Sequence, residues 1–182
     1  MKATMLSLLM VSCISAAYSQ KFLTRTGKVT FFSSTPVENI EAVNNEAACI
    51  ADLSSGQIMF QLPIKSFKFE KSLMQEHFNE NYMESDKFPK STFKGKISDL
   101  SAINPAKDGT YKVIVGGDLT MHGVTNHVLV PGTVTVKGGN VTAATSFKIK
   151  PADYKIAIPA VVATKIANEI EITVNAQMTA SN

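Results

Sequence analysis

Residues 111–130 read YKVIVGGDLTMHGVTNHVLV and contain the clearest strand pattern of the chain. Between Tyr111 and Met121, apolar side chains alternate with polar or small ones, which is the period of a strand with one buried face. Gly123 permits a tight turn, and the alternation resumes after it. The stretch therefore predicts an antiparallel β-hairpin.

Alternation with the same period recurs along most of the chain. The turn signals Ser54–Gly56 and Gly138–Asn140 separate neighbouring segments. After Ile64 the apolar face changes phase at Phe67 and Phe69, which predicts a β-bulge. Many strands joined by tight turns predict an all-β fold, either an antiparallel sandwich or a barrel. The other alternating segments are residues 27–31, 58–64, 93–97, 126–136, 141–149 and 170–178.

One segment breaks the period of two. Met74, Phe78 and Tyr82 recur every four residues, which predicts a short amphipathic helix of about three turns. Ser72 followed three residues later by Gln75 fits a capping box at its start. This is the only helix that the sequence predicts.

The N-terminal residues 1–19 have the pattern of a secretory signal peptide. Lys2 precedes a short apolar run, and small residues lead to a predicted cleavage site between Ser19 and Gln20. We expect a periplasmic or secreted protein whose mature chain, residues 20–182, is a single domain. Cys13 leaves a second interpretation open, in which the chain is a lipoprotein with its lipid on this cysteine.

The mature chain has little net charge and one cysteine. Loss of Lys2 with the signal lowers the formal net charge by one, from +3 to +2, which is too weak to indicate nucleic acid as a partner. With Cys13 in the signal, Cys49 has no partner for an internal disulfide. Its place in an alternating segment predicts a small buried side chain, with a reactive thiol as the alternative.

Three segments together resemble the YceI-like family. Residues 77–93 read HFNENYMESDKFPKSTF, residues 117–125 read GDLTMHGVT, and residues 147–156 read FKIKPADYKI. The second segment is the most specific, because it is similar to that family's Gly-Asp-Leu-Thr-x-His-Gly-Val-Thr hairpin. The order and spacing of the three segments extend the resemblance over about Val29 to Met178.

The resemblance implies an eight-stranded antiparallel, lipocalin-like barrel with one short helix. Characterised members of the family are often exported and hold a polyisoprenoid or another long amphiphile inside the barrel. The sequence departs from the family pattern at the first strand, where Gly27–Ser34 lacks the usual histidine. It also departs at Met74–His77 and Lys150, where the family usually has arginine.

The apolar faces of the alternating segments supply the candidate lining of the barrel lumen. A carrier needs an enclosed apolar space of this kind. An eight-stranded barrel encloses little more than its own side chains, so a filled core is the alternative. His77 on the helix can contact a ligand head group or cap surface structure. The predicted ligand-binding residues are Phe60, Leu62, His77, Phe78, Phe93, Val113, Val115, Leu119, Phe147, Ile170, Ile172 and Val174.

The titratable side chains form no recognisable catalytic or metal centre. His122 and His127 flank the hairpin turn and can meet across it, but no third ligand follows at a characteristic spacing. We expect His122 to bond the backbone of its turn. Glu76, Glu80 and Glu84 recur every four residues, which predicts a solvated helix face. Because a nucleophile elbow is also absent, we expect no enzyme activity, metal or cofactor, with an apolar-substrate hydrolase or isomerase as the weaker alternative.

The sequence therefore predicts an exported protein that holds a long apolar or amphiphilic ligand in its barrel. A polyisoprenoid, an isoprenoid quinone and a fatty-acid-like molecule are the expected ligand classes. Transient membrane contact for ligand exchange and pairing into a homodimer are further expectations. The alternative is a filled barrel that acts as an envelope protein interaction module through its loops at Ser98–Gly109 and Pro151–Ala163.

Overall fold

The structure is a computed structural model that describes residues 21–181. The predicted signal peptide, its cleavage site and Cys13 lie outside the described residues.

Nine β-strands and one short α-helix make up the described chain, together with single turns of other helix types. The 3₁₀ turns are Ile64–Ser66, Pro151–Tyr154 and Ala160–Val162, and a π-helical turn covers Phe78–Tyr82. The helix is α1 (Ser72–His77) and the strands are β1 (Lys21–Ser34), β2 (Asn39–Asp52), β3 (Gln57–Pro63), β4 (Lys68–Phe69), β5 (Lys90–Ile97), β6 (Gly109–Met121), β7 (Val124–Lys137), β8 (Asn140–Ile149) and β9 (Ile170–Ala180).

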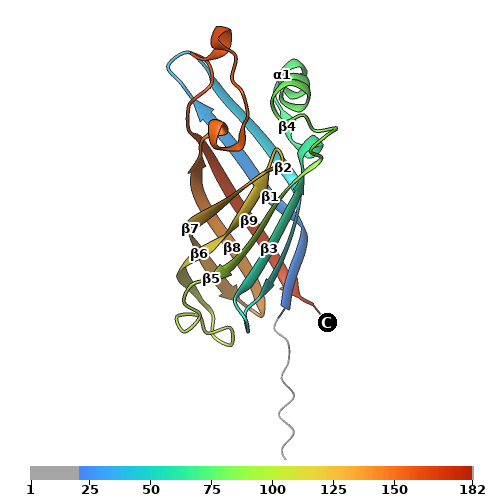
Figure 1. Cartoon of the computed structure of the whole chain (residues 1–182). Helices are drawn as coiled ribbons and strands as arrows, with labels where there is room; N and C mark the ends of the chain where they lie inside the picture. The colour runs from blue at the N-terminus through green and yellow to red at the C-terminus, as the bar shows by residue number, and fades with distance from the viewer. Residues whose placement is uncertain (1–20, 182) are drawn as a thin grey trace, which may run out of the picture.

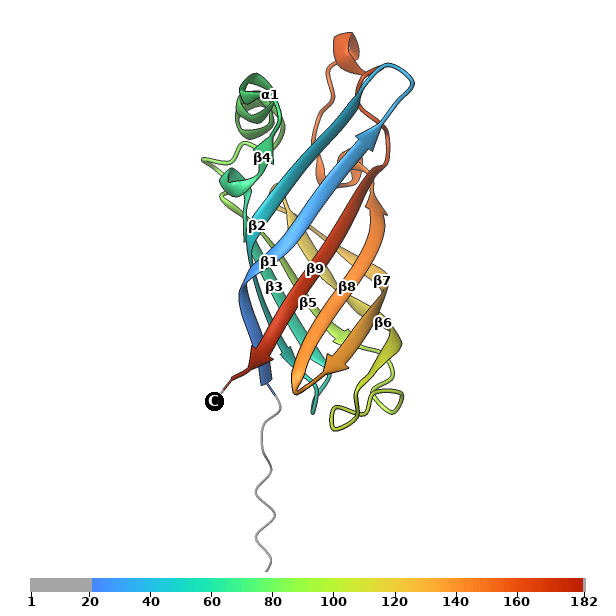
Figure 2. The ribbon, with the colours of Figure 1, turned by 180° about the vertical axis from the view of Figure 1, so that it is seen from behind.

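Eight of these strands close into an antiparallel barrel (Figures 1 and 2). The order around the barrel is β1-β9-β8-β7-β6-β5-β3-β2, and the pairing of β1 with β2 closes it. The two-residue strand β4 adds to β2 through the pairs Ala42 with Phe69 and Val43 with Lys68. The predicted eight-stranded lipocalin-like barrel is therefore confirmed.

The helix differs in detail from the prediction. α1 is followed directly by the π-helical turn, so the two together make the predicted amphipathic stretch. The capping box is wrong: the N-cap residue is Lys71, and no side chain caps the helix. Gln75 is used elsewhere, because its Oε1 accepts a hydrogen bond from the Phe69 backbone N–H at 3.4 Å. Among the described residues, no helix has the length and apolar character needed to cross a membrane.

The predicted bulge after Ile64 is also wrong. A 3₁₀ turn begins at Ile64 and changes the phase of the apolar face, and the Phe67 N–H donates to the Ile64 carbonyl at 3.2 Å. The Ile64 N–H donates to the Pro89 carbonyl at 2.9 Å. The turn thereby redirects the chain from the barrel wall toward β4 and α1.

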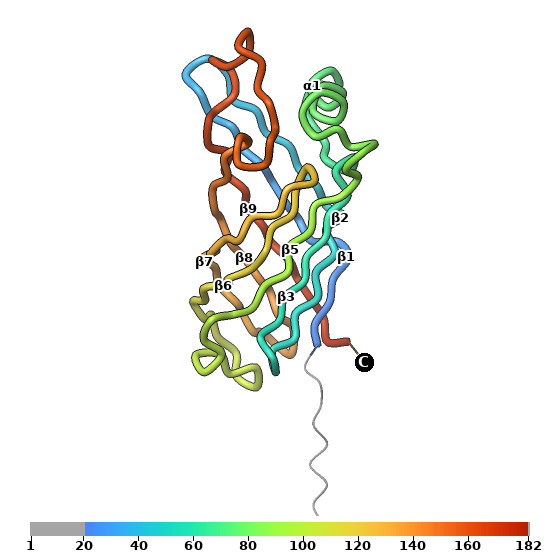
Figure 3. Tube along the Cα trace, in the orientation of Figure 1, coloured from blue at the N-terminus to red at the C-terminus, as the bar shows by residue number. Residues whose placement is uncertain are grey.

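The two ends of the barrel differ. One end carries both ends of the described chain, since Phe22 of β1 pairs with Ala180 of β9 (Figure 1). The opposite end carries α1, the β1–β2 turn and the segment between β8 and β9 (Figure 3). At the chain-terminal end, large buried side chains fill the lumen and close it. They include Phe22, Leu53, Ile97, Val136, Val141 and Met178.

A pair of facing glycines lets one aromatic ring lie across the lumen. Gly95 of β5 pairs with Gly117 of β6, and the Phe93 ring lies over both. A Cβ placed on Gly117 would come within 2.5 Å of the Gly95 Cα and the Lys94 carbonyl oxygen, and 2.7 Å of the Phe93 ring. Glycine at these positions is therefore required by close packing inside the barrel.

We predict that Gly117→Ala lowers the free energy of unfolding by about 1–3 kcal/mol, the usual cost of overpacking. The matched control is Gly116→Ala, because a Cβ there meets no backbone but only the ends of two exposed side chains, Leu129 at 3.2 Å and His127 at 3.7 Å. Its effect should stay within about 0.5 kcal/mol. Urea denaturation of both variants measures the difference, and equal midpoints would contradict the packing account.

Candidate functional site

The barrel lumen contains a cavity of about 580 Å³, which opens at the end that carries α1 and reaches down to Cys49, Ile58 and Val113. Small-molecule sites have volumes of roughly 300–1,000 Å³ and mostly apolar linings, so this cavity has the size of a ligand site. Its lining includes the exposed side chains of Lys71, Leu73 and Lys165 near α1 and in the segment before β9, which mark its mouth. The buried core at the other end closes it, so the lumen is filled over only part of its length.

All twelve side chains that the sequence predicts for the lumen line this cavity. They come from β3, β5, β6, β8 and β9, and from the helix and the turn that follows it. For those that lie on strands, the inward orientation follows from the strand period of two. Their role in ligand binding stays a prediction. They are Phe60, Leu62, His77, Phe78, Phe93, Val113, Val115, Leu119, Phe147, Ile170, Ile172 and Val174.

A cluster of phenylalanines beneath α1 extends the lining beyond that set. Phe31, Phe67 and Phe69 gather around Phe78, with ring centroids 5.0–5.5 Å from the Phe78 ring. All four rings line the cavity. In the sequence, Phe31 belongs to an alternating apolar face, and Phe67 and Phe69 follow the change of phase. The alternation pattern could therefore have identified all three as lining residues. The 3₁₀ turn that brings them together was not predicted.

Two buried features of the lining bear on its chemistry. Ser91 is 7% exposed, and its hydroxyl has no hydrogen-bond partner among the described residues. Cys49 is buried, as predicted, and desolvation by burial raises the pKa of its thiol to about 12. Because the thiolate is the nucleophile, Cys49 is an inert part of the wall near neutral pH. Ser91 is the buried polar group that remains free to bond a ligand.

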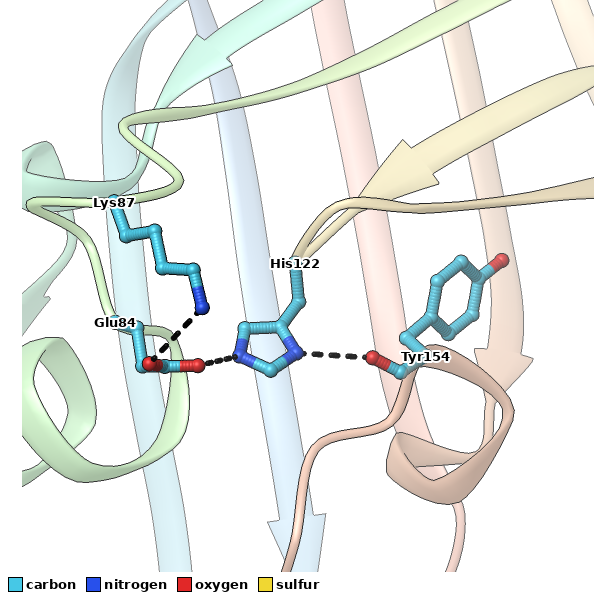
Figure 4. Close-up of polar contacts among 4 residues, drawn as sticks. All are labelled: Glu84, Lys87, His122 and Tyr154. Atoms are coloured by element: carbon cyan, nitrogen blue, oxygen red, sulfur yellow. Dashed lines mark hydrogen bonds and ion pairs between the residues drawn. The ribbon is translucent and has the colours of Figure 1, made fainter.

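His122 joins three segments beside the mouth of the cavity (Figure 4). Its Nδ1 donates to the Tyr154 carbonyl oxygen at 3.0 Å, and its Nε2 lies 2.7 Å from Glu84 Oε2. The other carboxylate oxygen of Glu84 lies 3.8 Å from Lys87 Nζ. The His122 side chain is only 10% exposed. Since a carbonyl and a carboxylate are both acceptors, the two bonds form together when each ring nitrogen carries a proton.

The His122 contacts hold a segment that covers a gap in the barrel wall. β7 and β8 pair only from Gly132 with Thr145 to Lys137 with Asn140, and their parts nearer α1 have no common ladder. The 3₁₀ turn after β8 packs there, where Asn126 Nδ2 donates to the Asp153 carbonyl at 2.8 Å. Tyr154 is buried beneath this turn, and burial raises the pKa of its phenol. His122 therefore fixes the wall of the cavity rather than touching its contents.

Two predictions for titratable residues are wrong. His122 bonds a distant carbonyl and not the backbone of its own turn, because its left-handed backbone conformation, with φ of 50°, aims the ring toward the segment after β8. Glu84 does not share a solvated helix face with Glu76 and Glu80. The helical stretch ends before Glu84, whose φ of 43° turns it toward His122.

His127 does not meet His122. Its Nδ1 lies 2.9 Å from Asp118 Oδ1 on the outer wall, and both side chains are about two-thirds exposed, at 67% and 63%. Within residues 21–181, no group of three histidine, cysteine or acidic side chains could hold a metal ion.

Comparisons with known proteins identify a family through one match and the fold through several others. The YceI-like domain family model matches residues 14–178. The solved structure of a polyisoprenoid-binding domain from Saccharophagus degradans, implicated in plant cell wall breakdown, is similar, with a TM-score of 0.76 and 16% identity over 90% of this chain and 99% of that chain.

Two further solved structures are similar in fold. BcnA from Burkholderia cenocepacia has a TM-score of 0.69 and 21% identity, covering 84% of this chain and 96% of its own. The YCEI protein of Campylobacter jejuni has a TM-score of 0.58 and 16% identity, covering 99% of this chain and 92% of its own. A search of curated proteins gave no match. At these identities the structural likeness establishes the barrel fold.

We predict that His122→Ala loosens the segment after β8 without unfolding the barrel. The Lys155 and Ile156 amides donate to carbonyls within this segment, so they report on its opening. Loss of hydrogen bonds worth about 1–1.5 kcal/mol corresponds to roughly tenfold faster amide exchange. Hydrogen–deuterium exchange with mass spectrometry measures the change.

The matched control is His127→Ala. It removes an exposed contact with Asp118 on the same hairpin, and exposed polar pairs contribute little to stability. Exchange in the segment after β8 should be unchanged in this control. Unchanged exchange in His122→Ala as well would show that His122 does not hold the segment.

Proposed function

The chain belongs to the YceI-like domain family, and on that premise we propose that it binds a long apolar or amphiphilic molecule inside its barrel. The observation that carries the proposal is the apolar cavity of about 580 Å³, closed at one end and open beside α1. Polyisoprenoids, isoprenoid quinones and fatty-acid-like molecules are the ligand classes that suit it. The polyisoprenoid-binding domain of Saccharophagus degradans supports the first of these.

The binding free energy expected for a long apolar ligand is large enough for a carrier. Long ligands gain about 0.3 kcal/mol per non-hydrogen atom, so a chain of about 40 carbons would gain on the order of 12 kcal/mol. That corresponds to a dissociation constant near the nanomolar range. Such a molecule is nearly insoluble in water, and a barrel that covers it lets it exist in an aqueous compartment. We propose export to the periplasm or the outside of the cell, on the basis of the signal-like residues 1–19.

Binding without catalysis is the function that the cavity chemistry favours. General acid–base catalysis needs titratable groups placed together around the reacting atoms. Of the titratable side chains in the lining, only Cys49 is fully buried, and its thiol stays protonated near neutral pH. The titratable lining residues are Glu38, Cys49, Lys71, His77, Tyr82 and Lys165.

Ser91 suggests that the ligand carries a hydrogen-bonding group. A buried hydroxyl without a partner costs free energy, and a ligand oxygen would remove that cost. Ser91 pairs in register with Leu62, and both side chains line the cavity. An amphiphile therefore suits the cavity better than a pure hydrocarbon.

The proposal is tested by blocking the cavity with a larger side chain. Ile172→Trp places an indole in the lining, and we expect at least tenfold weaker binding of cis-parinaric acid, a fluorescent long-chain fatty acid. Thr173→Trp is the matched control, because its side chain points to the outer face of the same strand. Equal affinities in the two variants would contradict binding in the lumen.

A second substitution tests the polarity of the ligand. Ser91→Ala should weaken displacement of cis-parinaric acid by hexadecanol about fivefold, the effect of losing one hydrogen bond of roughly 1 kcal/mol. Displacement by hexadecane should not change, because this ligand offers no polar group. Equal losses for the alcohol and the alkane would show that Ser91 acts only through packing.

A further inference from the structure

The segment between β8 and β9 has two parts, which the barrel holds differently. The first part, residues 150–156, is built into the wall, where Tyr154 is 2% exposed and its carbonyl accepts the bond from His122. The second part, residues 157–169, lies at the end of the barrel opposite the C-terminus, beside the β1–β2 turn (Figures 1 and 2). None of its residues is buried. We call residues 157–169 the flap.

The backbone hydrogen bonds of the flap close within the flap itself. The Val162 N–H donates to the Pro159 carbonyl at 3.0 Å, and the Ala163 N–H donates to the Ala160 carbonyl at 3.3 Å. The Lys165 N–H then donates to the Val162 carbonyl at 2.9 Å. Across residues 21–181, no backbone hydrogen bond joins the flap to another element. Because its turns are self-contained, the flap can move as one unit.

One hydrogen bond ties the flap to the barrel in the part of the chain that the structure describes. The Ala167 N–H donates to Ser33 Oγ at the end of β1, at 2.9 Å, and Ser33 is only 1% exposed. The flap also has an ion pair, in which Glu169 lies 3.7 Å from Lys148, but both side chains are about half exposed or more. Exposed pairs contribute little to stability. The Ala167–Ser33 bond is therefore the main polar restraint on the flap.

The inner face of the flap is part of the cavity. The half-buried side chains of Ile158, Val162 and Ile166 line it, and Lys165 lines the mouth. A molecule inside the cavity would therefore lie against these three aliphatic side chains. An outward movement of the flap removes them from the lining and widens the mouth, while the strand pairs of the wall stay intact.

The chain is fixed on both sides of the flap. Before it, the Tyr154 and Asp153 carbonyls accept hydrogen bonds from His122 and Asn126. After it, Ile170 pairs with β8 at the last position of the β8–β9 ladder. The ends of the flap are thus held, whereas its middle depends on one bond, which is the arrangement of a hinged loop.

We propose that the flap opens and closes the mouth of the cavity, and that the Ala167–Ser33 hydrogen bond keeps it closed. The proposal rests on the proposed function, because opening has a use only if a molecule enters and leaves the cavity. A long apolar ligand contacts the lining along its length, so its passage is faster when the aliphatic side chains of the flap move aside. The closed flap then shields the bound molecule from water.

A disulfide that holds the flap closed tests the proposal. Ser33→Cys combined with Ala167→Cys puts two thiols where the present hydrogen bond brings the residues together. Cys49 is buried and its thiol stays protonated near neutral pH, so it does not compete. In stopped-flow fluorescence, uptake and release of cis-parinaric acid should both be at least tenfold slower in the oxidised form than in the reduced form. Because both rates fall together, the dissociation constant should change by less than about twofold.

Thr110→Cys combined with Thr135→Cys is the matched control. These two hydroxyls lie 3.0 Å apart across the β6–β7 pair, and neither residue lines the cavity. Oxidation of this control should leave both rates unchanged. Ser33→Ala tests the opposite direction without a cross-link, because loss of one hydrogen bond should make release about fivefold faster.

Three outcomes would overturn the proposal if the parent protein binds cis-parinaric acid. One is equal rates in the oxidised and reduced forms of the flap variant, which would show that the ligand passes through the mouth while the flap stays closed. Another is an equal slowing in the oxidised control, which would show a general effect of cross-linking. The third is unchanged release in Ser33→Ala, whether or not the disulfide forms. Absence of binding in the parent protein refutes the proposed function instead.

Discussion

Closure of the barrel by the β1–β2 pair is the constraint on which the rest of the structure depends. Once the strands form a closed ring, the period of two sends alternate side chains to the lumen or to the outer wall. Large aliphatic side chains such as Leu53 and Met178 fill the lumen at the chain-terminal end. Toward α1 the same ring encloses more space than its side chains fill, and the cavity results.

The open end needs its own support, because fewer strand pairs reach it. The ladder between β7 and β8 stops at Gly132, and the 3₁₀ turn after β8 covers the gap. His122 holds that turn through the Tyr154 carbonyl and links it to Glu84 beyond the helix (Figure 4). The phenylalanines around Phe78 support the opposite side of the mouth. Hydrogen bonds and aromatic packing thus stabilise the mouth of the cavity, whereas strand pairing stabilises the barrel wall.

The sequence predicted the parts of the molecule that depend on local periodicity. Alternation alone placed Val113 and Ile172 on the face that lines the cavity, because each strand faces one lumen. It did not predict the partners of His122, because the bond to Tyr154 spans 32 residues and depends on how the barrel closes. The change of phase at Phe67 and Phe69 was visible, but a bulge and a 3₁₀ turn give the same local signal. The size of the cavity depends on how all the side chains in the lumen pack together, so it cannot be predicted from any single segment of the sequence.

Native mass spectrometry would show whether the barrel holds a long apolar or amphiphilic molecule. The mature protein would be purified from its own host without detergent and then extracted with organic solvent. We expect a discrete added mass on the protein and recovery of one class of apolar compound in the extract. A clean polypeptide mass that persists after incubation with polyisoprenoids and fatty acids would contradict it, because the cavity would then be unable to hold the ligands that suit its size and lining.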